Sequence, residues 1–188
     1  MHSKFLWLSD IYTHSHMSQG TPPFMAIALL LGADGDSTHH SKYDLESLMY
    51  VTFFCATMLK GPGSWRTEKE FKDQQSTPMR EWFDLRCLEE TYKQMGRTKV
   101  SHMEIFESSI IQKMAPFFKP LFPGFCRLRD AVFPPGKGYT NSPITHDAII
   151  NVFNDMLSNL PEEHRVAVPI SIKPKRGVKR SCEFLPCF

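Results

Sequence analysis

The sequence predicts a mainly helical protein of one domain, arranged around a buried central helix. In the later part of the chain apolar residues recur at three- and four-residue spacing, which is typical of amphipathic helices. The stretch YDLESLMYVTFFCATMLKG is instead apolar almost all the way round, as expected of a helix that is covered on every side. Beyond FLWL near the start, no alternating pattern of a strand competes with these helices.

The composition is that of an ordinary globular protein. Of 188 residues, 41% are hydrophobic and 22% charged, and the net charge of +2 is too small to indicate a nucleic acid or an anionic membrane as partner. No apolar run approaches the ~20 residues that span a bilayer. Five cysteines without a CxxC pair favour reduced thiols in an intracellular protein, cytoplasmic or nuclear.

The first elements are short. Residues 1–19 form a mostly polar N-terminal segment, in which FLWL could be one strand. Pro22 and Pro23 stiffen the backbone before a short helix over residues 24–31, which Gly32 is expected to stop.

The central helix is expected over residues 44–59, with Asp44 as its cap. Its all-round apolarity predicts that Leu48 and Phe54 are among its most covered residues. The polar, glycine- and proline-containing stretch over residues 61–78 is expected to be a poorly ordered connection.

Four further helical patterns follow. Apolar stripes predict helices from Trp82 to Met95 and, after a capping box at Ser101 and Glu104, from Phe106 to Phe117. A short helix fenced by prolines is expected within PLFPGFCRLRDAVFPP, and a last amphipathic helix over residues 145–160. These elements form one domain over residues 20–160, followed by a basic, disordered tail over residues 161–188.

Two motifs in the first quarter of the chain resemble the fungal-type protein kinase family. GTPPFMAIALL is similar to the family's G-T-x-x-F-M-A-I-E segment, and HHSKYDLESLMYV to its H-D-L-E-S-x-x-Y-V helix. REWF further on also fits. The resemblance covers residues 20 to about 160 and implies part of a kinase large lobe built around the central helix.

The resemblance also implies roles for three residues. Gly20 and Thr21 correspond to the end of the activation segment, where the threonine hydroxyl of Ser/Thr kinases contacts the catalytic loop. Asp44 corresponds to the acid that braces that loop through its backbone amides. One departure lies in the same motif, because Ala28 stands where the family has the glutamate that anchors this segment.

The groups that transfer phosphate precede the activation segment in kinases. They are a glycine-rich loop, a lysine on the phosphates, a catalytic aspartate and the ligands of magnesium. Only nineteen residues precede Gly20, and Asp10 in LWLSDIY is too isolated to be a metal motif. The family uses ATP and magnesium, but we expect no catalytic, cofactor-binding or metal residue in this chain.

Other types of site have little support. His14 with His16, and His39 with His40, lack further ligand spacing and are expected to be surface residues. No G-x-S-x-G elbow supports a hydrolytic triad. The cluster of lysine and arginine in SIKPKRGVKR is a weak signal for nuclear import.

Two hypotheses for function follow. The chain is a truncated fungal-type protein kinase, from a family that phosphorylates protein Ser/Thr, and is inactive by itself. Alternatively, it is a non-catalytic interaction module, a pseudokinase remnant that binds a protein partner or itself through uncovered apolar surface. The transcript upstream of Met1 would distinguish the two, because an in-frame catalytic loop supports only the first.

Overall fold

The structure is mainly helical, as predicted. A computed structural model describes residues 21–32, 40–67, 69–70, 78, 81–82, 89–140 and 143–162. In chain order its helices are α1 (Ile27–Leu31), α2 (Ser41–Met58), α5 (Glu89–Glu104), α6 (Phe106–Ser109), α7 (Phe122–Val132) and α8 (His146–Ser158). Short 3₁₀ turns are η1 (Pro22–Phe24), η2 (Ile111–Lys113) and η3 (Pro116–Leu121), and a hairpin consists of β1 (Leu59–Gly61) and β2 (Ser64–Trp65).

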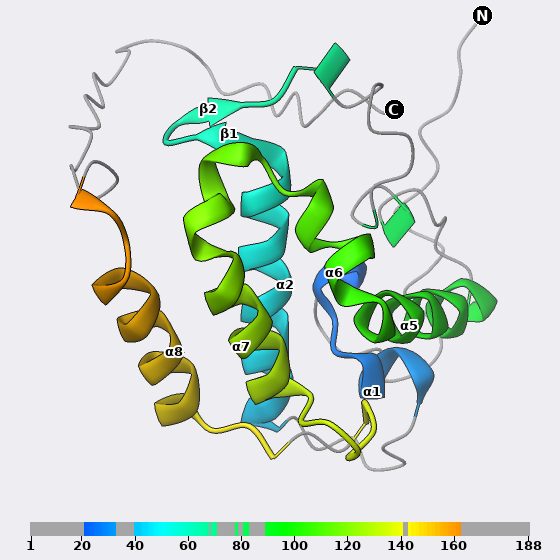
Figure 1. The fold of residues 1–188 in the computed structure, drawn as a ribbon. Helices are drawn as coiled ribbons and strands as arrows, with labels where there is room; N and C mark the ends of the chain where they lie inside the picture. Colours follow the sequence, from blue (N-terminus) through cyan, green and yellow to red (C-terminus); the bar gives the residue numbers. More distant parts are fainter. Residues whose placement is uncertain are drawn as a thin grey trace, which may run out of the picture.

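The long helix α2 lies in the middle of these elements. Figure 1 shows α7 alongside α2, α8 on the outer side of α7, and α1 with α5 on the opposite side. The Phe53 ring of α2 is fully buried and contacts the rings of Phe106 and Phe125, with centroids 5.1 and 6.1 Å apart. Aromatic side chains of three separate elements therefore meet on the central helix.

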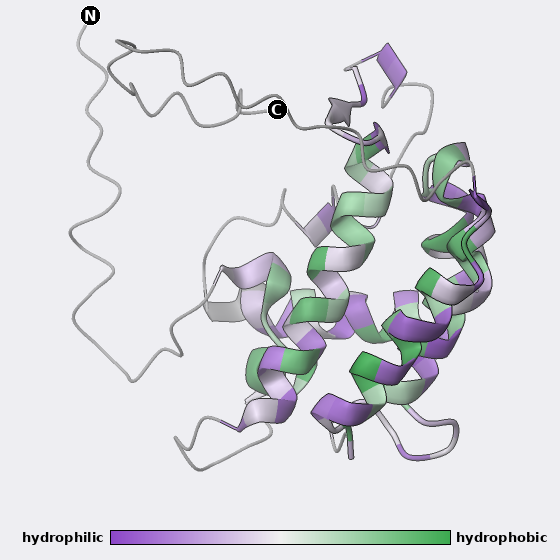
Figure 2. Ribbon diagram, turned by 90° about the vertical axis from the view of Figure 1, so that its left-hand side faces the viewer, coloured by the Kyte–Doolittle hydropathy of each residue, from purple (hydrophilic) through white to green (hydrophobic). Residues whose placement is uncertain are grey.

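The prediction that α2 is covered on every side is wrong. Leu48 is 42% exposed and Val51 39% exposed, and the Cys55 thiol on the same face is also exposed. Phe54 is only half-buried. The described elements pack on the faces of α2 that carry Tyr50 and Phe53, and so they leave one apolar stripe uncovered. Figure 2 shows hydrophobic and hydrophilic residues on the same helices.

The chain after α2 differs from the sequence expectation. The helix is expected to reach residue 59 and a poorly ordered connection to begin at residue 61, but β1 and β2 form an antiparallel hairpin over residues 59–65, directly after α2. The rest of that connection is described only at residues 66–67, 69–70 and 78, and the expected tail from residue 163 onward lies outside the described residues.

The capping box at Ser101 and Glu104 is also wrong as a helix start. Both residues lie in the last turn of α5, which continues to Glu104 before the chain bends at Ile105. The apolar stripe through Met95 and Met103 does not stop before Ser101, and that continuous stripe decides the course of the helix.

Other sequence signals are confirmed. Gly32 ends α1, and α7 lies within the proline-fenced stretch. Thr145 caps α8, since its hydroxyl accepts a hydrogen bond from the Ala148 amide at 3.3 Å. Among the described residues no helix is long and apolar enough to cross a membrane.

The contact between α7 and α8 depends on a glycine. A Cβ atom at Gly124 would lie 2.2 Å from Cγ of Met156, which is far inside van der Waals contact. The absence of a side chain at residue 124 therefore lets the two helices approach.

We expect Gly124→Ala to destabilise the fold by about 1–3 kcal/mol, because the added methyl overpacks this contact even though alanine favours a helix. Chemical denaturation measures the change. Shortening the opposing side chain should relieve the clash, so Met156→Ala combined with Gly124→Ala should cost less than the sum of the two single changes. Additive losses would contradict the proposed contact.

Candidate functional site

Thr21 and Asp44, two of the three residues that the resemblance assigns to a kinase function, occupy exposed positions. Thr21 directly precedes η1, its side chain is exposed, and its carbonyl accepts a hydrogen bond from the Phe24 amide at 2.8 Å. Asp44 is exposed in the first turn of α2. It is not the helix cap, because α2 begins at Ser41 after His40. Gly20 lies outside the described residues, and the contacts of Thr21 and Asp44 with a catalytic loop stay predictions.

The segment that follows Thr21 is attached to α2 by a buried carboxyl group. Oε1 of Glu46 accepts hydrogen bonds from the Ile27 amide and from the Tyr50 hydroxyl, both at 2.7 Å. Glu46 is only 2% exposed. The first amide of α1 is thus satisfied by a side chain of another helix, as a capping residue would do.

A buried lysine holds the same segment from α5. Nζ of Lys99 donates a hydrogen bond to the Met25 carbonyl at 2.6 Å. It also lies 3.8 Å from the ring centroid of Tyr50 and 5.1 Å from that of Trp82, and Lys99 is 0% exposed. Aromatic faces attract a cation and replace part of its lost hydration. We call Glu46, Tyr50, Trp82 and Lys99 the buried polar cluster.

Close packing brings α5 to this position. A Cβ atom at Gly96 would lie 2.8 Å from Cδ2 of Leu31 and 3.2 Å from Cβ of Leu30, so glycine at residue 96 allows the close approach of α1. Figure 1 shows α1 lying next to α5. The segment from Met25 to Leu31 is therefore enclosed by α2 and α5.

Ala28 fits this enclosure. Its side chain is buried in a small apolar cluster with Ala26 and Tyr43. A glutamate there would place a charge against apolar groups, at a large cost unless it found a partner. A small apolar side chain at residue 28 therefore suits this environment.

A second polar contact orients Trp82. Its indole N–H donates a hydrogen bond to Nδ1 of His102 at 3.0 Å, and Nε2 of His102 lies 3.3 Å from Oε2 of Glu81. Burial lowers the pKa of His102, although Glu81 opposes this shift. A neutral ring can accept from Trp82 while donating toward Glu81, so the contact fixes the face that Trp82 turns to Lys99.

Burial dominates the ionisation of the cluster. It raises the pKa of Glu46 from 4.5 to about 7, although the Ile27 amide, Tyr50 and two lysines oppose it. It lowers the pKa of Lys99 from 10.5 to about 7, although Glu46 opposes it. The pKa of Tyr50 is raised, first by burial and then by Glu46. The described contacts bind and position the segment, and they place no exposed nucleophile or base for catalysis.

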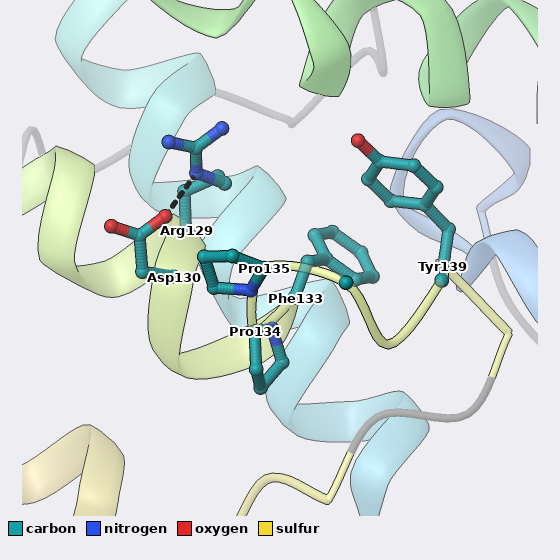
Figure 3. A pocket seen from close by; sticks show the side chains of 8 residues that line it. Arg129, Asp130, Phe133, Pro134, Pro135 and Tyr139 are labelled. Atoms are coloured by element: carbon teal, nitrogen blue, oxygen red, sulfur yellow. Dashed lines mark ion pairs between the residues drawn. The ribbon is translucent and has the colours of Figure 1, made fainter.

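A separate pocket of about 430 Å³ lies at the end of α7. It is lined by Arg129, Asp130, Phe133, Pro134, Pro135, Gly136, Gly138 and Tyr139. Figure 3 shows its one ion pair, in which Nε of Arg129 lies 2.6 Å from Oδ1 of Asp130. Arg129 also donates to the Met103 carbonyl at 3.1 Å. None of the four residues of the buried polar cluster lines this pocket.

The described residues show little that could hold a metal ion. Within the described part of the chain, no three His, Cys, Asp or Glu side chains converge on a possible metal position. The pocket has a single carboxylate, and that carboxylate is paired with Arg129. We therefore derive no catalytic step that uses ATP and magnesium.

The sequence analysis assigns no role to Glu46 or Lys99, although Glu46 belongs to the quoted DLES motif. Glu46 lies between Tyr43 and Tyr50 on the buried face of α2, and Lys99 lies between Met95 and Met103 on the stripe of α5. A single charge at a position where helical spacing demands an apolar residue is the signal that could have identified each of them.

We expect Glu46→Gln to change how stability depends on pH. A raised carboxyl pKa means that the stability contributed by Glu46 is fully present below about pH 4.5 and is lost as pH rises through 7. Relative to Glu46→Gln, the wild type should therefore lose about 3 kcal/mol between pH 4.5 and 7. Urea denaturation of both chains across this range measures the difference.

The direction of this change is the decisive observation. If the stability of the wild type relative to Glu46→Gln rises with pH, Glu46 behaves as an ordinary paired carboxylate. Its pKa is then lowered rather than raised by its environment. In Lys99→Met the loss should extend to higher pH, because the Lys99 charge lowers the pKa of Glu46.

Comparison with known proteins agrees with the resemblance. Residues 8–56 match the family described as fungal protein kinase, a range that includes Thr21, the Met25–Ile27 backbone and Glu46 but ends before α5. Searches of curated proteins and of solved structures gave no match. The mainly helical fold is consistent with a partial kinase-like domain. The chain thus has a partial match, over residues 8–56, to the fungal protein kinase family.

Proposed function

We propose that these 188 residues carry the large-lobe part of a fungal-type protein kinase domain. The family reaction is ATP-dependent phosphorylation of protein Ser/Thr. In this proposal the segment from Thr21 to Leu31 is the end of the activation segment, next to the acceptor hydroxyl. The segment serves as a platform for the protein substrate, and α2 and α5 fix its position.

One observation carries the proposal. The backbone of the matched segment is held by two buried side chains, through Ile27 to Glu46 and through Met25 to Lys99. Kinases achieve phosphoryl transfer mostly by positioning. A segment fixed at two backbone groups supports a positioning role better than a freely exposed loop would.

We also propose that the chain is inactive by itself. The sequence has no glycine-rich phosphate loop, no H-R-D-type catalytic loop and no convincing metal motif. Without these groups nothing neutralises charge on the transferred phosphoryl group. ATP and Mg²⁺ would bind to the kinase part that supplies these groups.

The experiment combines the full chain with the missing part. The N-terminal part of a fungal-type protein kinase, truncated just before its own G-T-x-x-F-M-A segment, is mixed with the chain, and phosphate transfer from ATP to Ser/Thr peptides is measured. Activity is expected only in the mixture. Thr21→Val should reduce it and Thr21→Ser should retain it, because only serine keeps the hydroxyl.

The positive control is the same N-terminal part mixed with its own C-terminal part. Activity of this control without activity of the test mixture would contradict the large-lobe proposal. Magnesium-dependent transfer by the chain alone would contradict its predicted inactivity.

A second candidate function is a non-catalytic interaction module, and the exposed stripe of α2 favours it. Leu48, Val51 and Cys55 have the spacing of one helix face and are all exposed. The exposed Trp65 lies beside this helix, since its ring is 6.5 Å from that of Phe54. We propose that a second copy of the chain covers this surface, because contiguous apolar surface favours association.

Sedimentation velocity over a range of concentrations tests self-association. Leu48→Lys combined with Val51→Lys should weaken it by about tenfold or more, because two charges would be buried at the interface. The matched control is Ile150→Lys combined with Leu157→Lys, which changes two exposed apolar residues of α8. An equal loss of self-association in both variants would contradict the proposal that the exposed stripe of α2 forms the interface. A wild type that stays monomeric would contradict it as well.

The cellular compartment is also a proposal. Cysteines without paired spacing support an intracellular location, and Cys55 and Cys126 are free thiols in the described part. The basic residues between Lys173 and Arg180 favour the nucleus only weakly.

A further inference from the structure

The segment from Thr21 to Leu31 has no charged residue at position 28 that could attach it to the rest of the fold. Ala28 is buried among apolar side chains and offers no charge. The segment's own secondary structure is limited to η1 and the five residues of α1. Pieces this short are not stable in isolation, so contacts from outside must fix them.

Lys99 provides a contact of this kind from α5. Its ammonium meets the Met25 carbonyl at 2.6 Å, at the residue between η1 and the start of α1. The Tyr50 ring on α2 lies beneath it at 3.8 Å, and Trp82 flanks it at 5.1 Å. A charge-assisted bond of this length is among the stronger hydrogen bonds. The same bond joins α5 to a segment 74 positions earlier in the chain.

Glu46 completes the arrangement without duplicating it. Glu46 accepts a hydrogen bond from the Ile27 amide, two residues after Met25, and another from the Tyr50 hydroxyl. The ring of the same Tyr50 faces Lys99. Lys99 and Glu46 thus bind the backbone on either side of Ala26, and Tyr50 contacts both of them. A segment held at a carbonyl and at an amide two residues apart cannot slide along α2 or turn about its own axis without breaking one bond.

We propose that Lys99 is the positioning residue of the activation-segment end, acting with Glu46 in place of a glutamate at residue 28. The significance of this contact for phosphate transfer rests on the proposed function. The contact itself can be measured in the full chain, with no activity assay. The anchoring role of Lys99 and the proposed kinase function can therefore be disproved independently.

Amide hydrogen exchange by NMR tests the inference at single residues. In Lys99→Met, exchange at Phe24, Met25 and Ile27 should speed up by about 10- to 100-fold, because a charged hydrogen bond to this backbone is lost. Amides of the α2 core, such as that of Phe53, should change less. Lys93→Met is the control, since Lys93 is exposed on the same helix.

Two further variants separate positioning from general stability. Lys99→Met combined with Glu46→Gln leaves no uncompensated buried charge, so global stability should recover while the segment stays more open than in the wild type. Lys99→Arg keeps a charged donor that stacks on aromatic rings, so its segment exchange should lie closer to the wild type than to Lys99→Met.

Three outcomes would overturn the inference. The first is segment exchange in Lys99→Met that equals that of Lys93→Met, which would mean that Lys99 does not bind the segment. The second is equal acceleration in the segment and at Phe53, and the third is full recovery of segment protection in the double variant. The second or the third outcome would assign Lys99 to general core stability.

Discussion

The contact of Lys99 and Glu46 with one short stretch of backbone is the constraint on which the rest of this structure depends. Lys99 bonds to the Met25 carbonyl and Glu46 to the Ile27 amide, each through a fully or nearly fully buried side chain. These bonds connect the Met25–Ile27 backbone to α5 and α2, which lie later in the sequence. Three other residues support the same contact. Trp82 supplies a ring face for Lys99, Gly96 allows α5 to approach α1, and His102 orients Trp82.

Burying two ionisable groups is costly, and this cost suggests that the cluster serves position more than stability. An ion pair in a protein interior is often no better than well-packed apolar residues of the same volume. Here burial moves the pKa of Glu46 and of Lys99 toward 7, so keeping either group ionised near neutral pH costs free energy. What the cluster provides instead is a defined backbone path from Met25 to Ile27, with directions that apolar packing cannot specify. The proposed substrate platform would require such a path.

Much of the fold could be predicted from sequence, because helical periodicity reports burial directly. The flanking prolines predicted α7, and the apolar stripe over residues 145–160 predicted α8. The same logic failed at Leu48, because all-round apolarity says that a helix can be covered and not that a neighbour covers it. The site was predictable only in part. The segment was identified by its motif, but the side chains that bind its backbone lie 19 and 74 positions away, and no local pattern pairs them.

The most direct test of the central claim is the pKa of the Lys99 ammonium. NMR titration of the chain labelled at lysine side chains measures it, with Lys99→Arg to assign the signal. The account predicts a pKa near 7, because the group is enclosed between the segment, Tyr50 and Trp82 and loses its hydration. An ordinary pKa near 10.5 would mean that Lys99 is in water, and that the segment is not held as described.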